Sequence, residues 1–106
     1  MTTDYKVRLD EKAIEVIKEN VLSNFGQDAR VLLFGSRVDL QQKGGDIDLL
    51  VLSALGSKEQ FKAKILTLSG IHRALGEQKI DLIPWNPKNK TTLLVVQEAL
   101  ENGVIL

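Results

Sequence analysis

The stretch that decides the fold is residues 31–52, VLLFGSRVDLQQKGGDIDLLVL. It contains two short apolar runs, residues 31–34 and 49–52, and such runs between Gly and polar residues are typical of buried strands. The polar connection, residues 36–45, is shorter than the dozen or more residues that a parallel crossover needs. We therefore expect the two strands to be antiparallel neighbours.

Two aspartates, Asp46 and Asp48, lead into the second of these strands, and Gly35-Ser36 ends the first. An antiparallel pairing places the end of one strand beside the start of the other. Side chains two residues apart share a face of a strand, so both carboxylates should point the same way. Like charges held together repel each other, and a bound cation commonly relieves this repulsion.

The residues before this stretch predict an amphipathic helix over residues 11–25, followed by a strand over residues 30–34. Asp10 is a suitable N-cap, and Gly26 stands where a glycine often ends a helix. The expected buried face has helical spacing and consists of Ala13, Ile14, Ile17, Val21 and Phe25.

A second helix is expected after the second strand. Ser57 and Gln60 have capping-box spacing, Gly70 is expected to end or bend the helix, and Gly76 closes the segment. The apolar face is marked by Phe61, Ile65 and Leu68, and the polar face, expected to be solvated, carries Lys58, Glu59, Lys62 and Lys64.

A third strand is expected over residues 79–83, with Pro84 as its end. Asp81 interrupts its apolar run, although aspartate is depleted in strand interiors. The helical connection favours a right-handed parallel crossover, which would bring Asp81 beside Asp46 and Asp48. An antiparallel third strand would instead loosen this cluster.

Thr91 or Thr92 is expected to cap a last helix that ends at Asn102-Gly103. The apolar residues 104–106 follow it. Leaving three aliphatic side chains in water costs free energy, so they should either pack on their own domain or join a partner surface. Packing on the domain is favoured, because a small domain needs its apolar residues for the core.

The length indicates one domain, residues 1–106, and the predicted helices and strands indicate the α/β (α+β) class with helices packed on a small mixed sheet. Lys+Arg 14 against Asp+Glu 14 leaves no net charge, so nucleic acid as a constitutive partner is not supported by electrostatics. The chain contains no cysteine, which excludes disulfides and thiolate metal sites. No apolar run approaches the ~18 residues of a membrane span, and we expect a cytoplasmic protein.

Three carboxylates beside a Gly-Ser turn suit metal-assisted phosphoryl chemistry. Mg²⁺ is commonly held by one or two carboxylates together with substrate phosphates, and a pair of ions can activate the attacking oxygen and stabilise the leaving one. Asp46 and Asp48 would bridge the metals, and Asp81 would complete the second site and draw a proton from the acceptor. Taken singly, each residue also has an ordinary explanation as a turn or surface residue.

The other polar residues of the stretch suit the same reaction. Gly35 would let a phosphate approach backbone N–H groups, and the Ser36 hydroxyl would donate to that phosphate. Arg37 would neutralise charge developing on phosphoryl oxygens. The expected reaction is in-line attack on the α-phosphorus of a nucleoside triphosphate, with release of pyrophosphate.

The segment GSRVDLQQKGGDIDLLV resembles the signature of the DNA polymerase β nucleotidyltransferase superfamily, which is Gly-Ser, a spacer and Asp-x-Asp. The short length, the Arg after Gly-Ser and the ending ALENGVIL resemble its minimal nucleotidyltransferase (MNT) branch. The resemblance implies a nucleotidyltransferase fold, triphosphate binding by Gly35 and Ser36, and Mg²⁺ binding by Asp46, Asp48 and Asp81. It also implies ATP as substrate and a helical HEPN-type protein as a possible partner.

Two main hypotheses follow. The first is a Mg²⁺-dependent nucleotidyltransferase that transfers AMP from ATP to an acceptor, possibly a partner protein. The second is a partner-binding subunit, such as an antitoxin, in which catalysis is weak or dispensable. A nucleotide sensor that binds without transfer is a third interpretation, and a homo-oligomer is possible in each case.

Overall fold

The computed structural model describes residues 7–38, 45–90 and 93–106. Their elements follow in the order α1 (Glu11–Phe25), β1 (Arg30–Phe34), the 3₁₀ turn η1 (Gly35–Val38), β2 (Ile47–Leu52), α2 (Ser57–Leu75), β3 (Ile80–Trp85), α3 (Leu94–Asn102) and β4 (Val104–Ile105). The predicted mixture of helices and strands is therefore confirmed.

The four strands form one mixed sheet in the order β3-β2-β1-β4. β1 pairs antiparallel with both β2 and β4, whereas β2 and β3 run parallel. Both pairings expected for the strands around the central stretch are confirmed. The parallel pair is joined by α2, which supplies the length that such a crossover requires.

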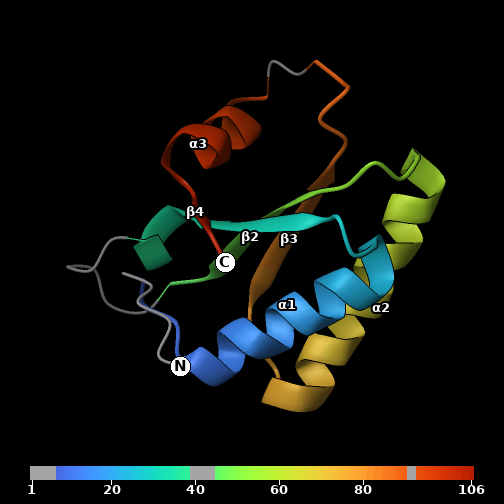
Figure 1. The fold of residues 1–106 in the computed structure, drawn as a ribbon. Helices are drawn as coiled ribbons and strands as arrows, with labels where there is room; N and C mark the ends of the chain where they lie inside the picture. Colours follow the sequence, from blue (N-terminus) through green and yellow to red (C-terminus); the bar gives the residue numbers. More distant parts are fainter. Residues whose placement is uncertain (1–6, 39–44, 91–92) are drawn as a thin grey trace.

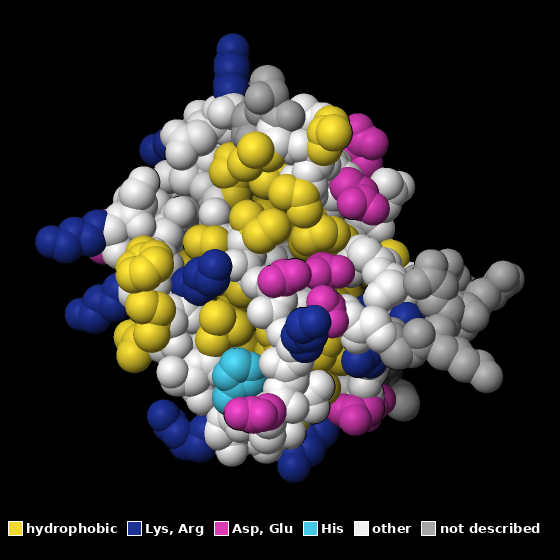
Figure 2. Space-filling view, turned by 180° about the vertical axis from the view of Figure 1, so that it is seen from behind, with side chains coloured by type: hydrophobic (Ala, Val, Ile, Leu, Met, Phe, Trp, Pro, Cys, Tyr) yellow, Lys and Arg dark blue, Asp and Glu magenta, His cyan; other side chains and the backbone are white. Residues whose placement is uncertain are grey.

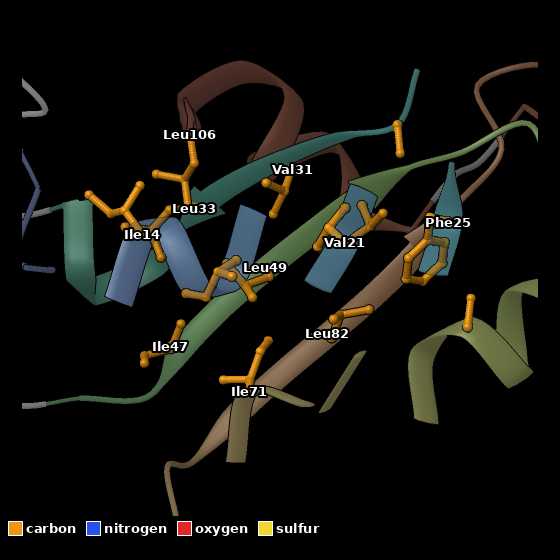
Figure 3. Packing of buried hydrophobic residues seen from close by; sticks show 14 residues of the cluster. Ile14, Val21, Phe25, Val31, Leu33, Ile47, Leu49, Ile71, Leu82 and Leu106 are labelled. Carbon is orange, nitrogen blue, oxygen red and sulfur yellow. The ribbon is translucent and has the colours of Figure 1, made fainter. Parts of the chain in front are cut away.

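Helices cover both faces of the sheet (Figure 1). α1 and α2 lie side by side on one face, and alternate strand residues such as Val31, Leu33 and Leu49 point into the core between them (Figure 3). α3 lies on the other face, where Val96 and Ala99 pack with Leu32, Phe34 and Leu50. The alternation of side chains along each strand thus divides the apolar residues into two layers.

The first helix has the bounds that its sequence predicts. The Asp10 side chain accepts a hydrogen bond from Ala13 N–H at 2.7 Å, and Gly26 is the C-cap. All five residues expected on its apolar face are buried. Local capping and periodicity are therefore sufficient to specify α1.

The second helix differs from the expectation at three points. Its buried residues are Gln60, Ala63, Thr67 and Ile71, whereas Phe61 and Ile65, expected on the apolar face, are 65% and 50% exposed. Gly56, not Ser57, is the N-cap, and no side chain caps the helix; Gln60 is buried and its Nε2 donates to Ser53 O at 3.3 Å. Gly70 does not end the helix, since α2 continues through it to Leu75. A side chain at Gly70 would overlap Asn20 of α1, so this glycine lets the two helices approach closely.

The third strand continues through Pro84 to Trp85 instead of ending before the proline. β3 comes first in the strand order and lies at an edge of the described sheet, where the missing N–H of a proline does not interrupt the ladder to a further strand. The expected cap of the last helix, Thr91 or Thr92, lies outside the described residues. Leu93 is the N-cap of α3 and provides no side-chain hydrogen bond.

The segment after α3 folds back onto its own domain. β4 pairs with β1 through Leu32↔Ile105 and Leu33↔Val104, and Leu106 N–H donates to Val31 O at 3.0 Å. Leu106 is buried in the α1/α2 layer, whereas the side chain of Ile105 is 60% exposed. Packing on the domain is thus confirmed for the end of the segment.

Candidate active site

The turn after β1 is pressed against Asp48. Gly35 has φ +76°, a conformation that residues with a Cβ rarely adopt. A Cβ at this position would overlap Asp48 Oδ2 and would lie 3.2 Å from Asp48 Cγ. Glycine is therefore required here for two reasons, its backbone conformation and the closeness of the carboxylate.

Asp48 and Asp81 are direct neighbours in the register of the parallel pair. The start of this pairing is fixed by a hydrogen bond from Ile47 N–H to Lys79 O at 2.9 Å. Asp48 lies two residues before Leu50, which belongs to the α3 layer, so both aspartates occupy the α3 face of the sheet. Asp48 is half-buried and Asp81 is exposed.

Asp46 lies directly before β2 and is half-buried. It follows Gly45, whose φ is +95° and whose added Cβ would overlap the Ser36 hydroxyl oxygen. The two glycines thus bring both ends of the 36–45 connection next to the aspartates. On the face shown in Figure 2, acidic side chains gather near the middle.

The electrostatic state of Asp48 reflects this crowding. Burial, followed by the nearby charges of Asp81, Asp46 and Glu98, raises the pKa of Asp48 above its ordinary value. Glu98 lies on α3 and was not expected at the site from sequence. The nearby carboxylates therefore repel one another, which favours binding of a cation.

The donor set suits Mg²⁺, although the side chains are not arranged as a complete cage. Within residues 7–38, 45–90 and 93–106, no three acidic or histidine side chains are grouped closely enough to hold a metal ion as they stand. Mg²⁺ needs only one or two carboxylates when substrate phosphates and water supply the other ligands. Asp48 and Asp81 can provide that pair, and Asp46 is near enough to act on the charge of Asp48.

Arg37 makes hydrogen bonds to backbone groups. Its Nη1 donates to Arg8 O at 2.8 Å, and its Nε donates to Gly45 O at 3.3 Å. It lines a cavity together with Ile47, which belongs to the α1/α2 layer on the other face of the sheet from Asp48. Phosphate binding by Arg37 stays a prediction, and its observed contacts indicate a different role that is argued below.

A cleft of about 400 Å³ adjoins the aspartates. Asp48 and Asp81 both line it, while Asp46 and Ser36 lie outside its lining. Its other lining residues are Phe34, Lys64, Leu68, Ile80, Leu82, Ile83 and Val95. Lys64 was assigned to a solvated helix face, but it is half-buried and supplies a cation to the cleft wall. The signal that could have placed Lys64 in the cleft wall is its position on the side of α2 that lies beside β3.

The described residues form an α+β domain whose mixed sheet pairs Asp48 with Asp81 on one face, and comparison with known proteins identifies its family. Residues 14–106 match the family model described as "Nucleotidyltransferase domain". The chain therefore belongs to the nucleotidyltransferase-domain family, which supports nucleotidyl transfer as its general chemistry. No curated protein matches the chain. Among the described helices, none is both long and apolar enough to cross a membrane.

Proposed function

We propose that this protein is a Mg²⁺-dependent nucleotidyltransferase that transfers AMP from ATP to an acceptor. The observation that carries the proposal is the register pairing of Asp48 with Asp81 on one face of the sheet, with Gly35 against Asp48. The raised pKa of Asp48 supports it, because a site that crowds carboxylates is suited to a divalent cation.

The residues of the chain have separate tasks in this reaction. Asp46, Asp48 and Asp81 would hold Mg²⁺, which supplies charge neutralisation at the phosphoryl oxygens. Gly35 and Ser36 would bind the triphosphate through backbone N–H groups and the hydroxyl. Asp81 is the exposed carboxylate and would accept the acceptor's proton as that oxygen attacks the α-phosphorus. The bond from the α-phosphorus to the bridging oxygen breaks, and pyrophosphate leaves.

The test is calorimetric titration with ATP in the presence and absence of Mg²⁺. The wild-type protein should bind ATP only with Mg²⁺, and Asp46→Asn combined with Asp48→Asn should abolish this binding. The fold should survive, because the substitutions remove repulsion between carboxylates. Asp28→Asn, in an exposed turn away from the cluster, is the control and should bind like the wild type. Unchanged binding in the double variant would contradict the proposal.

A second candidate function, partner binding, has its own support. Large apolar side chains are exposed on α2, where Phe61 is 65% and Ile65 50% exposed, and on α3, where Leu94 is 80% exposed. Figure 2 shows apolar surface over both helices, with the acidic side chains between them. Exposed apolar patches beside a site are typical of protein interfaces. The helical HEPN-type partner implied by the family resemblance is the candidate occupant.

Size-exclusion chromatography with light scattering can test this second function. A mixture with a HEPN-type protein should form a stable complex, and Phe61→Asp with Ile65→Asp should weaken it while leaving the monomer folded. Ser69→Asp, on the exposed surface of the same helix, is the control. Self-association of the wild-type protein that the same substitutions remove would point to a homo-oligomer instead.

A further inference from the structure

Arg8 and Arg37 hydrogen-bond to each other in both directions, although they are far apart in the sequence. Arg8 N–H donates to Arg37 O at 2.9 Å, and Arg37 Nη1 donates to Arg8 O at 2.8 Å. The segment before α1 is thereby attached to η1, the turn that carries the two residues proposed to bind triphosphate. We refer to these two residues and their hydrogen bonds as the Arg8–Arg37 pair.

The same two side chains reach both ends of the 36–45 connection. Arg8 Nη2 donates to Ser36 O at 2.7 Å, and Arg37 Nε donates to Gly45 O at 3.3 Å. A Cβ on Gly45 would lie 3.9 Å from Arg8 Nη2, so both guanidinium groups are close to this point. Charged donors make stronger hydrogen bonds than neutral ones, and the planar guanidinium fixes their directions.

These bonds also fix the position of the turn. The carbonyls of Ser36, Arg37 and Gly45 all accept hydrogen bonds from the Arg8–Arg37 pair. The pair therefore fixes where η1 lies relative to the start of β2. It lines a cavity with Ile47 on the α1 side, whereas Asp48 lies on the opposite face of the sheet.

We propose that Arg8 and Arg37 are positioning residues that hold the 35–38 turn against the start of β2 and so place Gly35 and Ser36 for binding of the nucleotide phosphates. This inference rests on the proposed nucleotidyl transfer and deepens it. It assigns a role to Arg8, which lies outside every motif of the sequence, and it gives Arg37 a positioning role in place of direct phosphate binding.

The experiment compares Arg8→Ala, Arg37→Ala, the double variant and Arg37→Lys in the full-length protein. Amide hydrogen exchange without nucleotide should be faster in residues 36–38 and 45–48 of each variant, while exchange in α1 and α2 stays unchanged. The dissociation constant for ATP with Mg²⁺ should rise on the order of tenfold to a hundredfold, since misplaced binding groups lose affinity steeply. Arg73→Ala, on the exposed side of α2, is the control.

The pattern among the variants separates positioning from direct charge. The double variant should lose about as much affinity as either single variant, because the two residues act as one unit. Arg37→Lys keeps the charge but cannot reproduce the two fixed donors, so it should behave like Arg37→Ala. Wild-type affinity in Arg8→Ala, additive losses, or full affinity in Arg37→Lys would each overturn the inference.

The hydrogen-exchange measurement keeps this inference distinguishable from the proposed function. If the wild-type protein bound no ATP with Mg²⁺, the proposed function would fail, and exchange in the turn would then decide the role of the pair alone. Unchanged exchange in residues 36–38 and 45–48 of the double variant would overturn it whatever the nucleotide data. Should Arg8→Ala fail to fold, Arg8→Lys provides the same comparison with the charge and much of the side-chain length retained.

Discussion

Replacing Gly35 by alanine tests the geometry of the candidate site most directly. The left-handed backbone conformation costs a residue with a Cβ about 1–2 kcal/mol. The new Cβ would also overlap Asp48 Oδ2, and moving that side chain off its rotamer costs about 0.5–1.5 kcal/mol. The free energy of unfolding should therefore fall by about 2–3 kcal/mol, which lowers the Tm of a domain of this size by roughly 10 °C.

The effect on function should be larger than the effect on stability, because the displaced group is a proposed metal ligand. Calorimetry should show loss of Mg²⁺-dependent ATP binding in Gly35→Ala at a temperature where circular dichroism shows it folded. Gly76→Ala is the matched control: its φ is +79°, and no atom lies within 4 Å of the added Cβ. This control should lose stability but bind ATP normally. Equal binding in both variants would refute the reasoning.

Asp48 and the C-terminal strand give the remaining predictions. Because the pKa of Asp48 is raised, the folded state keeps this proton to higher pH than the unfolded chain, and the stability contribution of Asp48 falls as pH rises from its ordinary toward its raised pKa. Asp48→Asn should remove this slope in urea unfolding and be neutral or mildly stabilising at neutral pH; clear destabilisation there would contradict it. Deleting residues 104–106 exposes Leu106 and the β1 edge, so urea unfolding at low concentration should show a loss of about 3 kcal/mol. Unchanged stability with lost self-association would instead make the tail an interface.

The sequence was sufficient where the structure depends on neighbouring residues. Asp10 and Gly26 bound α1 because capping is a local interaction. The antiparallel β1–β2 pair follows from the length of its connection, and the parallel β2–β3 pair follows from the intervening helix. The same local rules also predicted that Asp81 lies beside Asp48, and this pairing is the central feature of the candidate site.

The sequence was insufficient where distant residues override a local preference. Gly70 lies inside α2 where Asn20 of α1 leaves no room for a side chain, and no residue near Gly70 in the sequence reveals that contact. Arg8 lies in a segment without periodicity, yet its contacts lie near the proposed phosphate-binding turn. Glu98 was overlooked because its nearness to Asp48 depends on how α3 packs on the sheet, which the spacing of its own residues does not reveal.

The different lengths of the helices give a physical reason for an open cleft at the aspartates. The α1/α2 face is covered by helices of 15 and 19 residues, whereas the other face is covered by the nine residues of α3. At 1.5 Å per residue, α3 spans about 13 Å, while the six-residue strands β2 and β3 extend about 20 Å. α3 packs over Leu32, Phe34 and Leu50, while Asp48 stays half-buried and Asp81 exposed at the starts of their strands. A longer α3 that buried these carboxylates would have to pay their desolvation, whereas the short helix leaves them open to a cation and a nucleotide.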